Sequence, residues 1–158
     1  MQQSSFTLSD IRFSAMNFLA LREHSVKELK EKLGRKFSSS ELIDKAVSGL
    51  VEQNLQSDER FCQAFVSMRQ RQGKGSVVIK MELREKGVAP ELIAQFVDDA
   101  DSLWFELVRD VWSRKFRGAT PADARERAKQ MRFLHSRGFA SKHIQAVFVA
   151  ASDVDGDF

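Results

Sequence analysis

Residues 83–97 have the sequence LREKGVAPELIAQFV, and residues 134–148 have the sequence LHSRGFASKHIQAVF. In both stretches an isoleucine follows the first leucine after ten residues, an apolar residue follows after four more, and a glycine with an apolar neighbour lies between. Residues 33–47, LGRKFSSSELIDKAV, keep the same spacing through Leu33, Ile43 and Val47. A pattern that recurs at a constant interval of about fifty residues is typical of a tandem repeat.

Each copy predicts a pair of helices joined by a turn and preceded by a longer helix. The second helix of the pair starts in the same register in all three copies, at Ser40, Pro90 and Ser141. A unit this small buries only ~60% of its surface, so the units are expected to share hydrophobic joints. We therefore expect an all-α protein, an elongated, curved array of three three-helix units at residues 1–54, 55–101 and 102–152, followed by an acidic tail, 153–158.

The two prolines and eight glycines leave long stretches in which helices can form without interruption. Ser25 and Glu28 have the spacing of a capping box, and Thr120 with Pro121 is a typical helix start. Nine helices are predicted, at about 8–23, 26–36, 40–53, 58–72, 77–86, 90–100, 102–117, 121–137 and 142–151. The residues predicted to form the core are Leu29, Leu33, Leu83, Ile93, Leu134 and Ile144.

The net charge of +3 conceals a basic segment near the C-terminus. Residues 109–142 contain ten basic and three acidic residues, a local excess of seven positive charges. Such a segment suits binding to nucleic acid or to an acidic protein surface. A solvated helix face is an equally good explanation of the charge alone.

The composition excludes several classes of protein. Cys62 is the single cysteine, so an intramolecular disulfide is impossible and a reducing compartment is expected. The N-terminal MQQSSFTLSD lacks both the basic start and the apolar segment of a secretory signal. No apolar run approaches the ~20 residues that span a bilayer, so we expect a cytoplasmic protein without membrane contact.

No catalytic, cofactor-binding or metal site is predicted. Residues 73–76, GKGS, lack the remainder of a phosphate-binding loop and are more simply a flexible joint. The three histidines have no ligand partner at metal-binding spacing, and Cys62 is better explained as a small core residue than as a nucleophile. The acidic run 153–157 lacks the distal glutamate of a calcium loop. We expect no enzyme activity.

Three segments together resemble the RecX family of bacterial regulatory proteins. They are LREHSVKELKEKL at 21–33, the segment from DERF at 58–61 through Arg69 and Gly73 to ELREKGV at 82–88, and RFLHSRGF at 132–139. Their order and spacing cover about residues 10–150 and agree with the repeat. Two positions depart from the family pattern: Cys62 replaces the usual alanine, and Lys74 stands where many members have an aromatic residue.

The resemblance implies a non-enzymatic regulator of recombination and DNA repair, including the SOS response. Proteins of this family bind RecA, lie in the groove of the RecA–DNA filament, and suppress RecA's ATPase, strand-exchange and co-protease activities. No cofactor is implied, and we expect a monomer with weak nonspecific affinity for DNA. The residues we expect to contact RecA or DNA are Arg22, His24, Arg69, Arg71, Lys74, Arg109, Arg114, Lys115, Arg117, Arg132, Arg137 and Lys142.

Several alternatives remain open at this level. Ser25 and Glu28 are explained by capping without any partner, and Arg22 fits a structural role as well as a contact. The protein as a whole also fits an autonomous DNA-binding protein that uses one unit as a helix-turn-helix, although residues 142–148 offer few side chains able to read base edges. The periodicity alone also fits a helical-repeat scaffold for some other protein.

Overall fold

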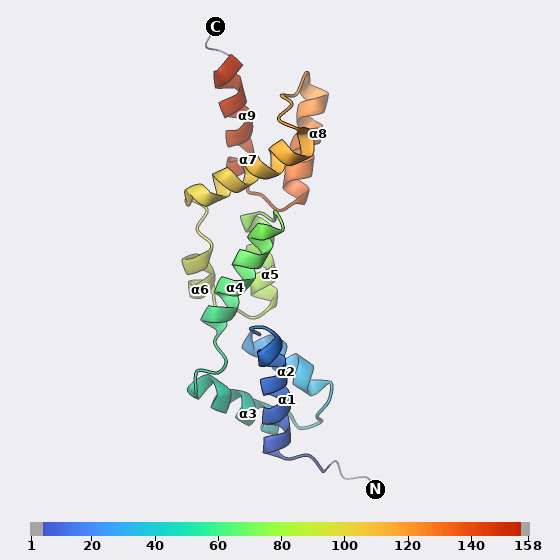
Figure 1. Ribbon diagram of the computed structural model, residues 1–158, viewed down its shortest axis with the longest axis vertical. Coiled ribbons are helices and arrows are strands. Elements are labelled where there is room, and N and C mark those ends of the chain that lie inside the picture. The colour runs from blue at the N-terminus through green and yellow to red at the C-terminus, as the bar shows by residue number, and fades with distance from the viewer. Residues whose placement is uncertain (1–4, 156–158) are drawn as a thin grey trace. The chain divides into compact units, whose positions relative to one another are not determined.

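The computed structural model describes residues 5–155, with side chains described through residue 149. Within this range the chain forms nine α-helices and no strand, which confirms the all-α prediction. The helices are α1 (Leu8–Leu21), α2 (Val26–Gly34), α3 (Ser40–Glu52), α4 (Asp58–Arg71), α5 (Ser76–Glu85), α6 (Pro90–Phe96), α7 (Ser102–Phe116), α8 (Ala124–Ser136) and α9 (Ser141–Asp155) (Figure 1).

The chain divides into two compact units, and each unit is discontinuous in sequence. Unit 1 contains Met1–Phe65 and Leu83–Ile93, and unit 2 contains Val66–Glu82 and Ala94–Phe158. The boundaries therefore fall inside α4, α5 and α6, so the middle group of three helices is shared between the units. The elongated, curved shape expected from the repeat stays a prediction.

The first three helices of unit 1 pack against one another around an apolar core (Figure 1). Each helix supplies buried side chains to this core: Ile11 and Ala15 from α1, Leu29 and Leu33 from α2, and Ile43, Ala46, Val47 and Leu50 from α3. Spacings of three and four residues place these side chains on one face of each helix. The remaining faces carry the charged residues.

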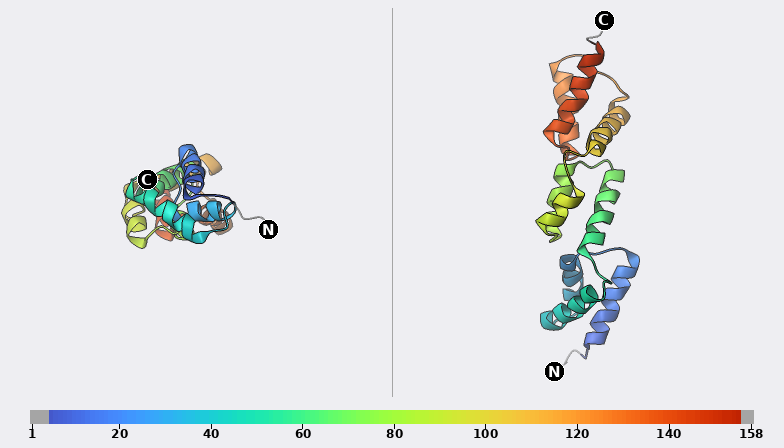
Figure 2. Two further views of the ribbon diagram at one scale, coloured as in Figure 1. Left: turned by 90° about the horizontal axis from the view of Figure 1, so that it is seen from below. Right: turned by 90° about the vertical axis from the view of Figure 1, so that its left-hand side faces the viewer.

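In unit 2 the helices α7, α8 and α9 form a second three-helix group (Figure 2). Val108 and Trp112 of α7 pack against Leu134 of α8 and Ile144 and Phe148 of α9. The indole N–H of Trp112 donates to Oε1 of Gln130 at 2.8 Å, and Nε2 of Gln130 donates to the Ala119 carbonyl at 3.1 Å. These bonds satisfy polar groups that would be costly to bury without partners.

The repeat positions are buried in the structure. The leucine of each copy is fully buried, and the isoleucine and the third apolar residue are exposed by no more than a few per cent; the nine residues are Leu33, Ile43, Val47, Leu83, Ile93, Val97, Leu134, Ile144 and Phe148. The six residues predicted to form the core are all buried. The spacing that identified the repeat therefore marks the faces that pack.

Within each unit, the turn that ends the second helix of one repeat contacts the start of the second helix of the preceding repeat. In unit 1 this first joint brings Glu85–Gly87 to Lys27 and Glu28 of α2, where Nζ of Lys27 donates to the Glu85 carbonyl at 2.9 Å. In unit 2 the second joint brings Arg137–Phe139 to Gly75–Val78 at the start of α5. Both joints place a helix C-terminus against a helix N-terminus.

The second joint is made by the backbone itself. The amide of Gly75 donates to the Arg137 carbonyl and the amide of Val77 to the Gly138 carbonyl, each at 2.9 Å. Amides of the first helical turn have no partner within their own helix, so the carbonyls of the following repeat supply it. The segment 73–76 is thus held by backbone hydrogen bonds at the joint between α4 and α5.

Several helix ends differ from the predicted ones. Helix α8 begins after Asp123, whose side chain accepts from the Glu126 amide at 2.8 Å, so the predicted start with Thr120 and Pro121 was wrong. Helix α6 ends at Phe96 and not near residue 100. Helix α9 continues through Asp155, into the predicted acidic tail 153–158. The side chains of that tail and its last three residues lie outside the described part of the chain.

Two glycines of the second joint should tolerate no larger residue. A Cβ atom on Gly75 would overlap the Gly138 carbonyl and the Phe139 amide, and one on Gly138 would overlap Val78 at a φ of +89°. We expect Gly75→Ala and Gly138→Ala each to lower the free energy of unfolding by about 2–4 kcal/mol, from steric overlap and from backbone strain at Gly138.

Gly34→Ala is the matched control, because nothing lies within 4 Å of its added Cβ atom. Urea unfolding followed by circular dichroism would measure all three variants. Equal stability of Gly75→Ala and Gly34→Ala would contradict the close backbone approach at this joint.

Candidate functional site

The N-terminal candidates Arg22 and His24 lie in a polar cluster at the start of α2. The capping box is present: Oγ of Ser25 accepts from the Glu28 amide at 3.1 Å, and Oε1 of Glu28 accepts from the Ser25 amide at 3.2 Å. Arg22 adds a second Glu28 contact, 2.9 Å between Nη2 and Oε2, and Lys86 of the first joint adds a third at 3.2 Å. Glu28 is therefore a structural residue.

His24 is buried, with 1% of its surface exposed. Nζ of Lys32 lies 2.8 Å from Nε2, and Nδ1 lies 3.0 Å from the Arg22 carbonyl. Because an ammonium group can only donate, Nε2 accepts and Nδ1–H donates. Burial is the largest cause that lowers the pKa of His24, and nearby cations add to it, so the ring is neutral near pH 7. The ring is thus enclosed in unit 1, and a contact of His24 with a partner stays a prediction.

The pKa values in this cluster reflect its density of charge. Burial would raise the pKa of Glu28, but hydrogen bonds from Arg22, from the Ser25 amide and from Lys86 outweigh it and lower the pKa to about 2. Burial also lowers the pKa of Lys32. Arg22 keeps 48% of its side chain exposed while it pairs with Glu28, which leaves it accessible to a partner.

The candidates near the α4–α5 turn have different surroundings. Nη2 of Arg69 lies 2.6 Å from Oε2 of Glu82, which ties α4 to α5 within unit 2. Arg71 is exposed, and its Nη1 donates to Oγ of Ser67 at 2.9 Å. Lys74 is half-buried and directly precedes the tightly packed Gly75. Arg71 is thus the most accessible cation of the three.

Most basic candidates of α7, α8 and α9 are exposed. Six of the seven lie on the surface of unit 2: Arg109, Arg114, Lys115, Arg117, Arg132 and Lys142. The seventh, Arg137, is half-buried at the second joint, where its Nη2 donates to the Gln72 carbonyl at 2.6 Å. Its Nε is buried without a hydrogen-bond partner. The basic segment is therefore an accessible surface with one partly enclosed arginine.

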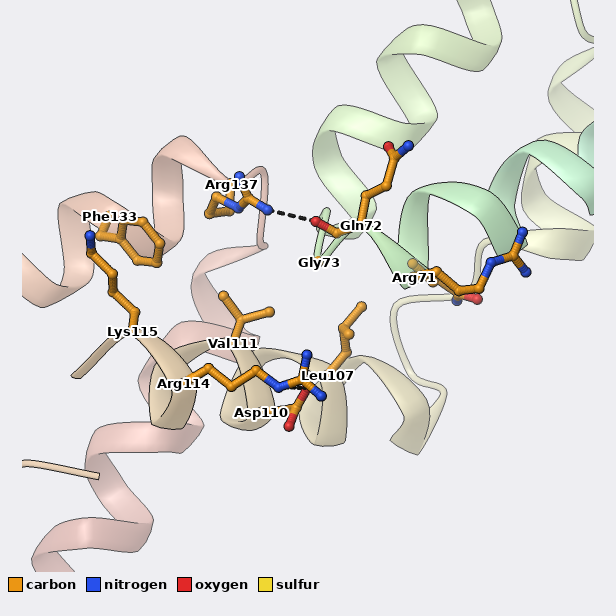
Figure 3. Close-up of a pocket in the computed structure, with 11 residues that line it drawn as sticks. Arg71, Gln72, Gly73, Leu107, Asp110, Val111, Arg114, Lys115, Phe133 and Arg137 are labelled. Atoms are coloured by element: carbon orange, nitrogen blue, oxygen red, sulfur yellow. Dashed lines mark hydrogen bonds and ion pairs between the residues drawn. The ribbon is translucent and has the colours of Figure 1, made fainter. Parts of the chain in front are cut away.

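Four of these candidates line one open pocket in unit 2, which we call the Arg137 pocket (Figure 3). The pocket has a volume of about 300 Å³ and lies between the C-terminal ends of α4 and α8 and one face of α7. Its lining includes Arg71, Gly73, Val111, Arg114, Lys115 and Arg137. Charge counting had found these cations but could not show that the fold brings them together.

The acidic residue and the aromatic residue of the pocket were both absent from the sequence-based candidates. Asp110 lines the pocket and pairs with Arg114, 3.3 Å between Oδ2 and Nε. Phe133 also lines it, and Nζ of Lys115 lies 5.2 Å from the centre of its ring. The i, i+4 spacing of Asp110 and Arg114 would have predicted their ion pair on a helix. The sequence carried no comparable signal for Phe133.

The described residues give little support for a metal site, a reactive cysteine or a membrane-spanning helix. Among them, no three histidine, cysteine or acidic side chains are placed so as to hold a metal ion. The Cys62 thiol is buried, and burial, with a smaller effect of Asp58, raises its pKa to about 11, which disfavours the reactive thiolate. None of the described helices combines the length and apolar character needed to cross a membrane.

Comparisons with known proteins agree with the three-helix repeat. The family model described as RecX, second three-helix domain, matches residues 57–96, and the model described as RecX, third three-helix domain, matches residues 101–148. A protein of Pseudomonas fluorescens strain ATCC BAA-477, named regulatory protein RecX, is 44% identical over 134 residues, covering 85% of this chain and 86% of its own length. A protein of the same name from Halorhodospira halophila is 35% identical over 155 residues, covering 98% of this chain and 96% of its own.

Solved structures share the fold. The crystal structure of RecX from Lactobacillus salivarius superposes with a TM-score of 0.77 at 20% identity, covering 93% of this chain and 97% of that one. A second crystal structure, described as regulatory protein RecX, gives a TM-score of 0.71 at 18% identity, covering 93% and 80%. These similarities extend the all-helical architecture to experimentally solved proteins.

The Glu28 cluster should make stability depend on pH in the acid range. The pKa is about 2 in the folded protein and near 4.5 ordinarily, so the stabilisation is complete above pH 4.5 and is lost as the pH falls toward 2. Between pH 6 and pH 3 the wild type should lose about 2 kcal/mol more of its unfolding free energy than Glu28→Gln, which cannot titrate.

Urea titrations of both proteins at the two pH values would measure this difference. A parallel loss in the two proteins would show that Glu28 is not held ionised by Arg22 and Lys86.

Proposed function

Because the chain belongs to the RecX family of regulatory proteins, we propose that it binds RecA and the RecA–DNA filament and inhibits RecA's ATPase, strand-exchange and co-protease activities. In this proposal the protein acts by binding alone, without a cofactor or a catalytic step. It works as a monomer in the cytoplasm, where the filament assembles.

The observation that carries the proposal is the exposed basic surface of unit 2. Nine of the ten basic side chains of residues 109–142 lie exposed on α7–α9 and the turn after α7. A filament that presents DNA phosphates beside protein offers negative charge over a long path, which favours such a surface. Arg22 and Arg71 are exposed enough to add contacts.

Inhibition follows from differential affinity. A protein that binds one arrangement of neighbouring RecA protomers more tightly than another shifts the filament toward that arrangement. If the favoured arrangement is one in which ATP turnover is slow, hydrolysis and strand exchange fall together. No residue of the regulator then needs to touch the nucleotide.

The second candidate function is autonomous DNA binding through α9 as a recognition helix. Lys142 and Gln145 are exposed at the start of α9, but His143 and Ile144 are buried in unit 2. Few side chains therefore remain to read base edges in a groove. We favour the regulator for this reason.

The test is RecA's single-stranded-DNA-dependent ATP hydrolysis at increasing amounts of the protein. We expect inhibition at amounts well below one protein per RecA protomer. The variant R132E/K142E, which reverses two exposed charges of unit 2, should need about thirtyfold more protein for the same inhibition, because each reversed contact costs on the order of 1 kcal/mol.

The variant K45E/R84E is the matched control, because both residues are exposed and lie outside the proposed contact surface. Circular dichroism of both variants would confirm folding. Absence of inhibition by the wild type, with active RecA and DNA, would refute the proposal. Tight, sequence-selective duplex binding without RecA would favour the second candidate.

A further inference from the structure

The two joints use the same repeat position for a cation but surround that cation differently. Lys86 and Arg137 each directly precede a glycine of positive φ, Gly87 and Gly138. In the first joint the chain supplies the matching anion, since the Glu28 carboxylate, with 7% of its side chain exposed, lies between Arg22 and Lys86. The cation of the first joint therefore has an anionic partner within the chain.

The second joint lacks this anion. The position fifty residues after Glu28 is Val78, which is apolar and packs against Gly138. Arg137 is left with a backbone carbonyl, that of Gln72, as its partner at Nη2 and with a buried Nε that has none. A buried donor without a partner carries a desolvation penalty, so this joint is electrostatically incomplete.

The incomplete joint opens into the Arg137 pocket. Figure 3 shows the Arg137 guanidinium on one side of the pocket and Arg114 and Lys115 extending from α7 on the other. With Arg71, four cations line the pocket, and Asp110 is the single acidic residue among the lining side chains. Asp110 is already paired with Arg114. The cations of the pocket therefore outnumber its carboxylates, and the pocket has room for an anionic ligand.

We propose that the Arg137 pocket binds a phosphate group of a nucleic-acid backbone, which supplies the negative charge that Glu28 supplies in the first joint. This inference deepens the proposed function and rests on it for the presence of DNA beside the protein. A nucleic-acid backbone suits the site because a guanidinium fork matches phosphate oxygens and because successive phosphodiesters of one strand bring more than one negative charge to the four cations. The open side of the pocket admits a strand that continues past it.

The first experiment measures binding of a short fluorescein-labelled oligothymidylate by anisotropy across a range of salt concentrations. We expect the wild type to bind, and R114Q/K115Q to bind about tenfold more weakly with a salt dependence shallower by about two phosphate contacts. The matched control is R125Q/K129Q, which removes the same charge from exposed positions of α8 outside the pocket. It should weaken binding by no more than about twofold.

A second variant gives an effect of opposite sign that unfolding could not produce. Asp110→Asn removes the pocket's single carboxylate and frees Arg114. We expect it to tighten oligothymidylate binding by about threefold, from the loss of one like-charge repulsion. Arg137→Lys keeps the charge but removes the guanidinium fork, and it should weaken binding by about fivefold while circular dichroism stays unchanged.

The outcomes separate this proposal from the proposed function when the same variants enter the RecA assay. Wild type that inhibits RecA but binds no oligothymidylate would overturn the phosphate site and leave the regulator intact. Wild-type protein that binds the oligonucleotide through the pocket but leaves RecA activity unaffected would support the phosphate site and overturn the proposed regulation of RecA. Equal losses of oligothymidylate affinity in R114Q/K115Q and R125Q/K129Q would also overturn the phosphate site. So would an R114Q/K115Q variant that keeps its affinity for the oligonucleotide and loses affinity for DNA-free RecA.

Discussion

The packing of one repeat's turn against the start of the preceding repeat's second helix is the contact on which the architecture depends. A three-helix group of about fifty residues buries only ~60% of its surface and is marginally stable alone. The contact therefore has to be close, and Gly87 and Gly138 permit this through positive φ angles and the absence of a side chain. At the second joint the approach is close enough for carbonyls of one repeat to bond amides of another.

Much of the fold could be predicted because its determinants are local. The helical spacing of apolar residues identified all nine helices, and the box of Ser25 and Glu28 formed as its spacing required. The differences lie at the ends of helices. Thr120 with Pro121 was the predicted start of α8, and the structure uses Asp123 as the N-cap instead.

The candidate site was less predictable because its pairings are distant in sequence. Counting charges located the basic surface, but the bond of Arg137 to the Gln72 carbonyl joins residues 65 positions apart. The same limit explains His24, whose polar ring suggested an exposed contact, whereas Lys32 and a carbonyl satisfy it inside the unit. Lys86 was overlooked for a related reason: its partner Glu28 belongs to the preceding repeat, and no sequence pattern connects them.

The interleaving of the two units has a consequence for how the protein can be divided. The chain passes from one unit to the other after residues 65, 82 and 93, so each unit is completed by a segment that the other interrupts. Cutting at a repeat boundary would leave the first three helices without Leu83–Ile93 and would deprive them of the Lys86 partner of Glu28. A single repeat cut out of the chain would therefore lack contacts that complete its unit, and unfolding of one unit is expected to destabilise the shared helices α4, α5 and α6 of the other.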